Sequence, residues 1–136
     1  VSTAQMQVRN QKLQTMQDLI SKVFDKAIES IKSFDNSKYL EMLYGLIIHS
    51  TINGDEEIVL SPGDRLKINN EFMTKLNNEL KNRGKKGQMV LSDETRDIQG
   101  GFILKTRDVE INSSIEAIVK SLRNEIEQEI ASILFA

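Results

Sequence analysis

The chain has 136 residues, enough for one compact domain with an appendage and too few for two full cores. It contains no cysteine, which excludes disulfides, thiolate metal sites and a cysteine nucleophile and fits a reducing, cytoplasmic setting. The formal net charge is −2 with basic and acidic residues interleaved, which argues against a nucleic-acid partner, and no apolar run is long enough to span a membrane.

The first segment, residues 3–34, contains no proline or glycine and predicts one long helix. Its apolar residues alternate in steps of three and four from Leu13 to Ala27, a spacing that places them on one narrow seam. The stripe widens toward Phe34, as expected where a helix enters a globular core. Because the sequence starts at Val1 and not at Met, we expect it to be a fragment of a longer chain.

The central region predicts short elements of both kinds. A second helix is expected over 38–52, after capping residues 35–37, and a strand over 57–60. Ser61 followed by Pro62 predicts a further helix start, and that helix is expected to run to Arg83-Gly84 with a break near Ile68-Asn69.

The last third predicts a second strand over 88–91 and a hairpin formed by 101–106 and 109–111. Ser113 and Glu116 have the spacing of a capping box, which predicts a final helix that carries apolar residues on one face. The fold class is therefore α+β: a long amino-terminal helix followed by a small domain with a short mixed or antiparallel sheet packed by helices. We divide the chain into the end of a stalk-like helix, 1–34, and a globular domain, 35–136.

No motif in the sequence supports catalysis. A catalytic histidine needs an orienting carboxylate together with a nucleophile or substrate pocket, and nothing near His49, the single histidine, offers that arrangement in sequence; it is expected to be a helix-end residue. Residues 83–87 (RGKKG) lack the spacing of a phosphate loop and predict a solvated turn. The acidic runs 55–57 and 93–94 lack the pattern of a calcium loop. We expect no catalytic residue, no cofactor and no metal.

The first helix is the feature with the clearest functional content, because an isolated amphipathic helix needs a cover for its apolar stripe. Pairing with another chain is one explanation, and packing on the chain's own domain is the other. If a partner helix covers the seam, its contacts are expected at Met6, Leu13, Met16 and Ile20.

Taken in order, these elements resemble the E subunit of V-type or A-type rotary ATPases. Residues 8–13 (VRNQKL) and 19–27 (LISKVFDKA) are similar to that family's helical entry into its globular domain. Residues 100–104 (GGFIL), 109–117 (VEINSSIEA) and 130–135 (IASILF) are similar to its glycine-led strand, hairpin, serine-capped helix and Leu-Phe ending.

The resemblance implies a non-catalytic peripheral stalk, or stator, which resists torque during ATP-coupled proton or sodium transport. It implies pairing with the helical G or H stalk subunit, binding to the catalytic head near the B subunit, and a cytoplasmic location that meets the membrane only through the complex. A regulator of a flagellar or secretion export ATPase is an alternative, as is an unrecognised small ligand-binding domain or enzyme.

Overall fold

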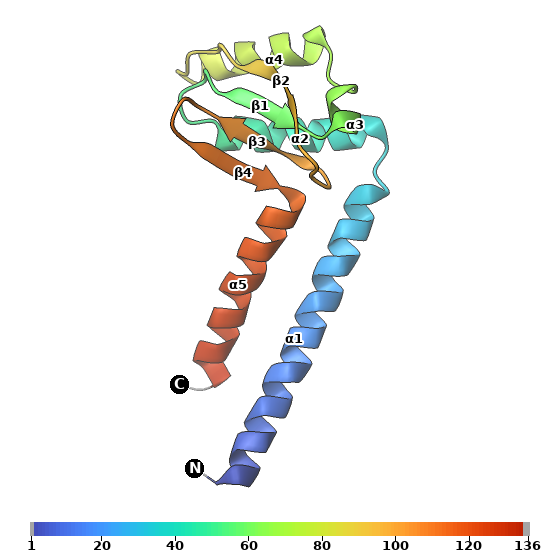
Figure 1. Cartoon of the computed structure of the whole chain (residues 1–136), viewed down its shortest axis with the longest axis vertical. Coiled ribbons are helices and arrows are strands. Elements are labelled where there is room, and N and C mark those ends of the chain that lie inside the picture. Colours follow the sequence, from blue (N-terminus) through green and yellow to red (C-terminus); the bar gives the residue numbers. More distant parts are fainter. Residues whose placement is uncertain (1, 135–136) are drawn as a thin grey trace. The chain divides into compact units, whose positions relative to one another are not determined.

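The computed structural model describes residues 2–134 and confirms the α+β class (Figure 1). A long helix comes first, a small mixed sheet with helices follows, and a second long helix ends the described chain. In chain order the elements are α1 (Thr3–Lys32), α2 (Asn36–Ser50), β1 (Glu57–Leu60), α3 (Pro62–Arg65), α4 (Asn70–Asn82), β2 (Val90–Thr95), β3 (Gly101–Lys105), β4 (Glu110–Ser114) and α5 (Ile115–Leu134).

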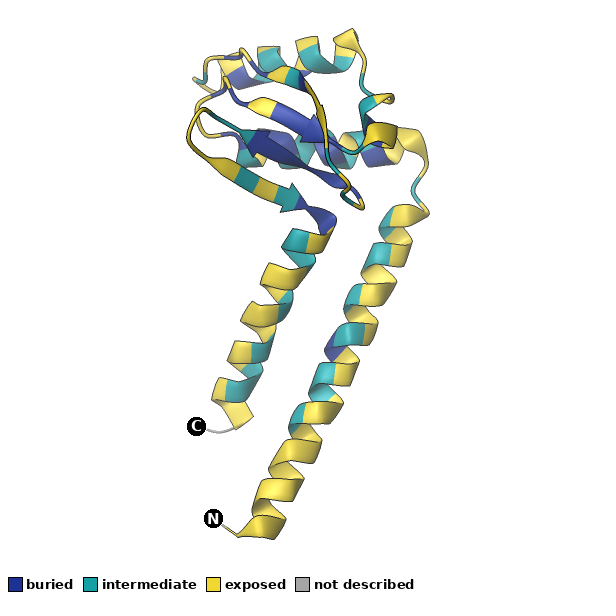
Figure 2. Cartoon of the chain, in the orientation of Figure 1, coloured by how far each residue is buried: buried dark blue, intermediate teal, exposed yellow. Residues whose placement is uncertain are grey.

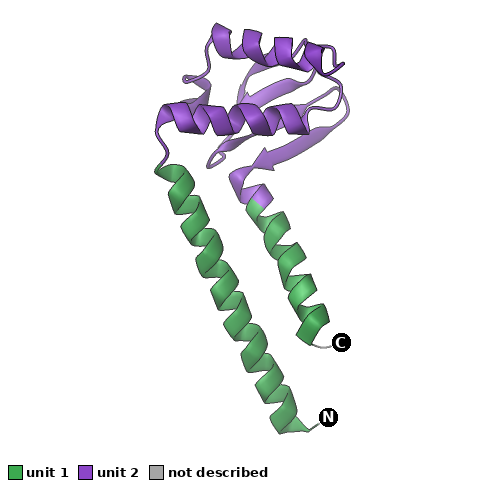
Figure 3. Cartoon of the chain, turned by 180° about the vertical axis from the view of Figure 1, so that it is seen from behind, with its two compact units in different colours: residues 1–33, 119–136 green, residues 34–118 purple. Residues whose placement is uncertain are grey.

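The chain forms two compact units (Figure 3). The first, here called the helical unit, combines residues 2–33 with residues 119–134, and therefore contains α1 and most of α5. The second, the sheet unit, comprises residues 34–118. The sequence analysis instead divided the chain by function between residues 34 and 35 and assigned the whole last helix to the globular domain. That functional division stays a prediction.

The sheet has four strands in the order β2-β1-β3-β4. β1 is parallel to β2 and antiparallel to β3, and β3 is antiparallel to β4. The tight β3–β4 connection is closed by a 2.8 Å hydrogen bond from the Thr106 N–H to the Val109 carbonyl. Gly101 begins β3 with φ +78°, and a Cβ there would collide with the Ser113 carbonyl, so only glycine allows the two strands to approach this closely.

Alternation along the strands places one apolar set on each face of the sheet. Ile58 pairs with Leu104 on one face, and Val59 pairs with Ile103 on the other; all four side chains are buried. The residues that complete this core come from both long helices of the sheet unit: Leu43, Ile47, Leu76 and Leu80.

The helix starts predicted at residues 35–37 and at Ser61 are confirmed. Asp35 caps α2 by accepting the Lys38 N–H at 2.8 Å, and Ser61 caps α3 with Pro62 in its first turn. The predicted break falls where Asn69 caps α4 by accepting the Phe72 N–H at 2.8 Å. Each cap satisfies an N–H group that the helix itself cannot pair.

Two local predictions were wrong. The strand expected at 88–91 runs from Val90 to Thr95. Met89 is held to the Asn77 side chain, and beyond Leu91 the pairing with β1 resumes, after a shift in register, at Thr95 opposite Leu60. The expected capping box at Ser113 does not form either. Ser113 lies in β4, Ser114 accepts the Ala117 N–H, and the Glu116 carboxylate accepts the Gln99 N–H.

A buried tyrosine joins three segments of the sheet unit. The Tyr39 hydroxyl donates to Asp64 Oδ2 at 2.6 Å and accepts the Gly101 N–H at 3.0 Å, and Lys67 lies 3.5 Å from the other oxygen of Asp64. Burial and the bond to Asp64 raise the pKa of Tyr39, so the phenol stays protonated and remains a donor.

We expect Tyr39→Phe to lower the free energy of unfolding by about 1–3 kcal/mol, because it leaves the buried Gly101 N–H and a buried Asp64 oxygen without their partner. Urea denaturation at neutral pH measures this effect. Tyr44→Phe is the matched control, since the Tyr44 hydroxyl reaches only the Lys75 carbonyl at 3.5 Å and its loss should change stability by less than about 0.5 kcal/mol. Equal effects of the two substitutions would contradict the role given to Tyr39.

Candidate functional site

The helical unit contains an apolar hollow of about 210 Å³ between α1 and α5. Side chains from the middle of α1 form one wall, and Ile126 and Ile130 of α5 form the other. The α1 wall consists of Met16, Leu19, Ile20, Val23 and Phe24. We call this feature the helix-pair hollow.

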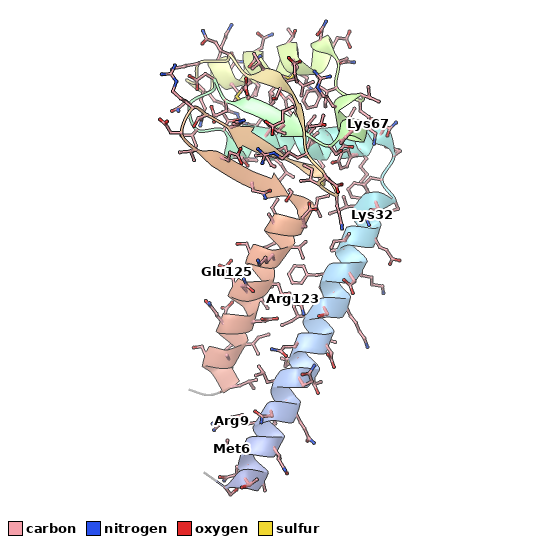
Figure 4. The ribbon with its side chains drawn as sticks, in the orientation of Figure 1. Met6, Arg9, Lys32, Lys67, Arg123 and Glu125 are labelled. Carbon is pink, nitrogen blue, oxygen red and sulfur yellow. The ribbon has the colours of Figure 1, made fainter. Side chains whose placement is uncertain are left out.

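The structure places the predicted seam residues in different surroundings. Met6 is 53 % exposed near the amino-terminal end of α1 (Figure 4), in a stretch where residues 2–10 are exposed all round (Figure 2). Leu13 and Met16 are half-buried, and Ile20 is 8 % exposed. Met16 and Ile20 line the helix-pair hollow together, whereas Met6 and Leu13 do not. Their role as partner contacts stays a prediction.

The residues at the open side of the hollow are those that α5 leaves uncovered. Leu19 and Val23 lie one helical turn apart and are 56 % and 61 % exposed, and Ile126 on α5 is 37 % exposed. Exposed apolar side chains on two neighbouring helices are the surface onto which a third helix packs, because one of its side chains can fill the space between them.

A polar contact fixes α5 to α1 beside the hollow. The Arg123 guanidinium donates to the Ser21 hydroxyl across the two helices (Figure 4) and also to Glu127 at 3.2 Å. Ser21 neighbours Ile20, so this hydrogen bond holds the two apolar walls in register. Met16 and Ile20 therefore share the helix-pair hollow with Ile126 and Ile130 of α5, a second helix of the same chain.

Sequence reasoning missed the α5 side of this surface. It identified an apolar face on the last helix and assigned that face to the domain core. Ile126 and Ile130 are spaced four apart, as are Met16 and Ile20 on α1. Two such stripes in one chain are the signal for helix pairing, but the pattern of each stripe does not identify its partner.

The basic turn at 83–87 has a structural role and is less solvated than predicted. Lys85 is half-buried and its ammonium donates to the Thr51 carbonyl and, at 3.2 Å, to the Ile52 carbonyl, at the carboxyl end of α2. Lys86 pairs with Asp55 at 3.1 Å. Lys85 binds a helix end, where positive charge is favourable, Lys86 binds a loop carboxylate, and the two are not arranged around a phosphate site.

Glu56 is the one acidic residue of the 55–57 run that is buried, with 1 % of its surface exposed. Its carboxylate accepts the N–H groups of the four preceding residues, 52–55, at distances from 2.7 to 3.3 Å. This arrangement closes the turn between α2 and β1. The carboxylate is saturated by backbone donors and is not positioned as a base or a metal ligand.

His49 lies exposed in the last turn of α2, as expected for a helix-end residue. Across residues 2–134, no three His, Cys, Asp or Glu side chains gather in a way that could hold a metal ion. Within the same range, no helix has both the length and the apolar character needed to cross a membrane.

The described chain is therefore an α+β protein with exposed apolar side chains on both helices of its helical unit, such as Leu19, Val23 and Ile126. Comparison with known sequences identifies the family. Residues 1–135 match the family described as ATP synthase (E/31 kDa) subunit, and the chain belongs to this family.

Individual relatives agree with the family. The chain is 46 % identical to the E subunit of the V-type ATP synthase of Clostridium botulinum strain Hall, and also 46 % identical to the E subunit of the V-type proton ATPase of the Loch Maree strain. In both cases all of this chain aligns and covers 68 % of the relative. It is 40 % identical over 129 residues to the V-type ATP synthase E 1 subunit of Clostridium tetani, where 95 % of this chain covers 65 % of the relative.

Proposed function

We propose that the chain is a non-catalytic peripheral-stalk subunit of a V/A-type rotary ATPase. In this role it resists torque and links the catalytic head to the membrane part during ATP-coupled proton or sodium transport. Its partners are the helical G or H stalk subunit, at the helical unit, and the head near the B subunit, at the sheet unit. It lies on the cytoplasmic side and meets the membrane only through the complex.

The observation that carries this proposal is the helix-pair hollow with Leu19 and Val23 exposed at its open side. Covering an exposed Leu and an exposed Val removes apolar surface from water, which favours association by about 25 cal/mol for each Å² buried. The family membership favours a rotary ATPase over an export ATPase as the complex that supplies the partner.

Titration of the cognate G/H-type subunit onto the chain, followed by calorimetry, tests the stalk role. We expect a one-to-one complex whose formation has a negative heat-capacity change, the signature of apolar burial. Absence of binding at micromolar concentrations of both chains would contradict the proposal.

We expect the purified chain neither to hydrolyse ATP nor to bind it tightly. The basic turn at 83–87 is engaged with a helix end, and within residues 2–134 His49 has no carboxylate as a hydrogen-bond or ion-pair partner to orient it. A phosphate-release assay and nucleotide titration measure both properties. Turnover that persisted through purification and disappeared in His49→Ala would contradict this expectation.

A further inference from the structure

The sheet unit carries a second surface that differs from the helix-pair hollow in its chemistry. Two adjoining hollows, of about 560 and 400 Å³, lie on the outer side of α2 and α4 and share Tyr44 and Lys75. Figure 3 shows α2 and α4 next to each other on this side of the sheet, and the two helices are in contact. We call this surface the α2–α4 groove.

The floor of the groove is apolar and ordered by aromatic contacts. Leu40, Tyr44 and Phe72 are all half-buried there, and the Tyr44 and Phe72 rings meet edge to face with centroids 5.8 Å apart. The Lys75 ammonium lies 4.8 Å from the centre of the Tyr44 ring. An aromatic centre inside a polar rim is the usual composition of a protein-binding surface.

The rim is acidic. Glu79 is paired with Arg83 at 2.9 Å, and Lys75 is held over Tyr44. Glu41 and Glu71 also line the groove, and within residues 2–134 neither has an ion-pair partner within 4.0 Å. The carboxylates left available therefore favour a positively charged occupant.

The exposed side of α4 includes two residues that do not favour a helix. Thr74 and Asn78 lie four apart on the groove side, and both are poorer helix formers than Ala, Lys or Glu. No hydrogen bond within the described chain engages either side chain. By contrast Asn77, on the inner side, bonds both the N–H and the carbonyl of Met89. Residues that weaken their own helix, and whose side chains bind nothing inside the chain, are typical of a functional surface.

A second group of charged residues in the sheet unit is already engaged internally. Arg96 binds Glu110 through two bonds of 2.6 and 3.0 Å and Glu94 at 2.9 Å, and Lys105 binds Glu94 at 3.1 Å. This ion network joins β2, β3 and β4 on the face of Ile103. Its charges satisfy one another, whereas those of the α2–α4 groove do not.

We infer that the α2–α4 groove is the surface with which the sheet unit binds the catalytic head, and that its occupant is a basic segment carrying one apolar or aromatic side chain. The apolar side chain enters between Leu40, Tyr44 and Phe72, its cations pair with Glu41 and Glu71, and its backbone bonds Thr74 and Asn78. This inference rests on the proposed stalk function and assigns its head contact to particular residues.

The test measures binding of the full chain, in complex with its G/H-type subunit, to purified head that lacks its peripheral stalk. We expect Glu41→Lys with Glu71→Lys to weaken head binding at least ten-fold, and wild-type binding to weaken as salt is raised. Asp97→Lys with Asp108→Lys is the matched control, because both residues are exposed outside the groove and the change in charge is the same. The control should bind within about two-fold of wild type.

A second variant separates binding from folding. Thr74→Ala with Asn78→Ala installs better helix formers, so its melting midpoint should equal or exceed that of wild type. The same variant should bind the head at least five-fold more weakly, while pairing with the G/H-type subunit is unchanged. Wild-type affinity for the head in both groove variants would overturn the groove assignment and leave the stalk role intact. Failure of the wild-type complex to bind the head would overturn both.

Discussion

Glu56→Ala should lower the free energy of unfolding by about 3–5 kcal/mol. The substitution leaves the N–H groups of residues 52–55 without their common acceptor in a partly buried turn. An unsatisfied buried donor costs about 1–3 kcal/mol, and less where water can enter, so the buried Gly54 N–H contributes most. Urea denaturation at neutral pH measures the loss. Glu57→Ala is the matched control, since Glu57 is exposed and adjacent, and it should change stability by less than about 0.5 kcal/mol.

The effect of Glu56 should also depend on pH. Burial alone would raise the pKa of the Glu56 carboxyl, but the N–H donors of Ile52, Gly54 and Asp55 outweigh it and the pKa lies below its ordinary value of 4.5. A lowered folded-state pKa adds stability above the unfolded-state pKa, and that stability is lost as the pH falls through the folded-state value.

Glu56→Gln resembles the protonated side chain, so its difference in stability from wild type should be constant near neutrality and shrink below about pH 4.5. Parallel urea titrations of the two proteins at several pH values measure this convergence. A difference that grew in acid would contradict the sign of the pKa shift and the role given to the backbone donors.

The sequence was most informative where structure is decided by near neighbours. Asp35, Ser61 and Asn69 each cap the helix that follows them, because a short polar side chain can reach an N–H three residues ahead whatever the rest of the fold does. The apolar, β-branched run at β1 was predicted with its observed bounds for a similar reason.

The sequence-based predictions were wrong where contacts between segments distant in sequence determine the local structure. The polar end of β2 has little intrinsic preference for a strand and becomes one through pairing with β1. Ser113 and Ser114 have equal potential as a helix cap, and both pair with β3, but it is Ser114, the last residue of β4, whose hydroxyl accepts the Ala117 N–H. The α2–α4 groove was not predicted either, since its floor combines Tyr44 and Phe72 from helices that meet only in the folded chain.

The candidate site shows the same limit. Periodicity identified Met16 and Ile20 as a seam, but it could not assign Ile126 and Ile130 as their neighbours across the helix-pair hollow. Because α1 pairs with α5, only substitutions at the open side of the hollow test the binding of a partner helix without disturbing the chain's own packing. Side chains inside the hollow pack within the chain itself, whereas the exposed ones at its open side are those that the proposed partner helix would cover.

Leu19→Glu with Val23→Glu should reduce affinity for the G/H-type subunit at least hundred-fold, about 3 kcal/mol, while the melting midpoint of the free chain changes little. Both side chains are more than half exposed in the free chain, so the new carboxylates remain in water there. Binding of a partner helix would bury them without cations to pair with, which costs several kcal/mol. Calorimetric titration of the partner, beside melting curves of each chain alone, measures the two effects.

Ile20→Glu should behave differently, because Ile20 is only 8 % exposed against α5 and a charge there disrupts the helix pair itself. The melting midpoint of this variant and its affinity for the G/H-type subunit should both fall. Gln11→Glu with Lys22→Gln is the matched control: it makes the same change in net charge at exposed positions that helical periodicity places away from the hollow, and it should retain partner affinity within about three-fold. Full affinity in Leu19→Glu with Val23→Glu would show that the partner helix binds elsewhere on the chain.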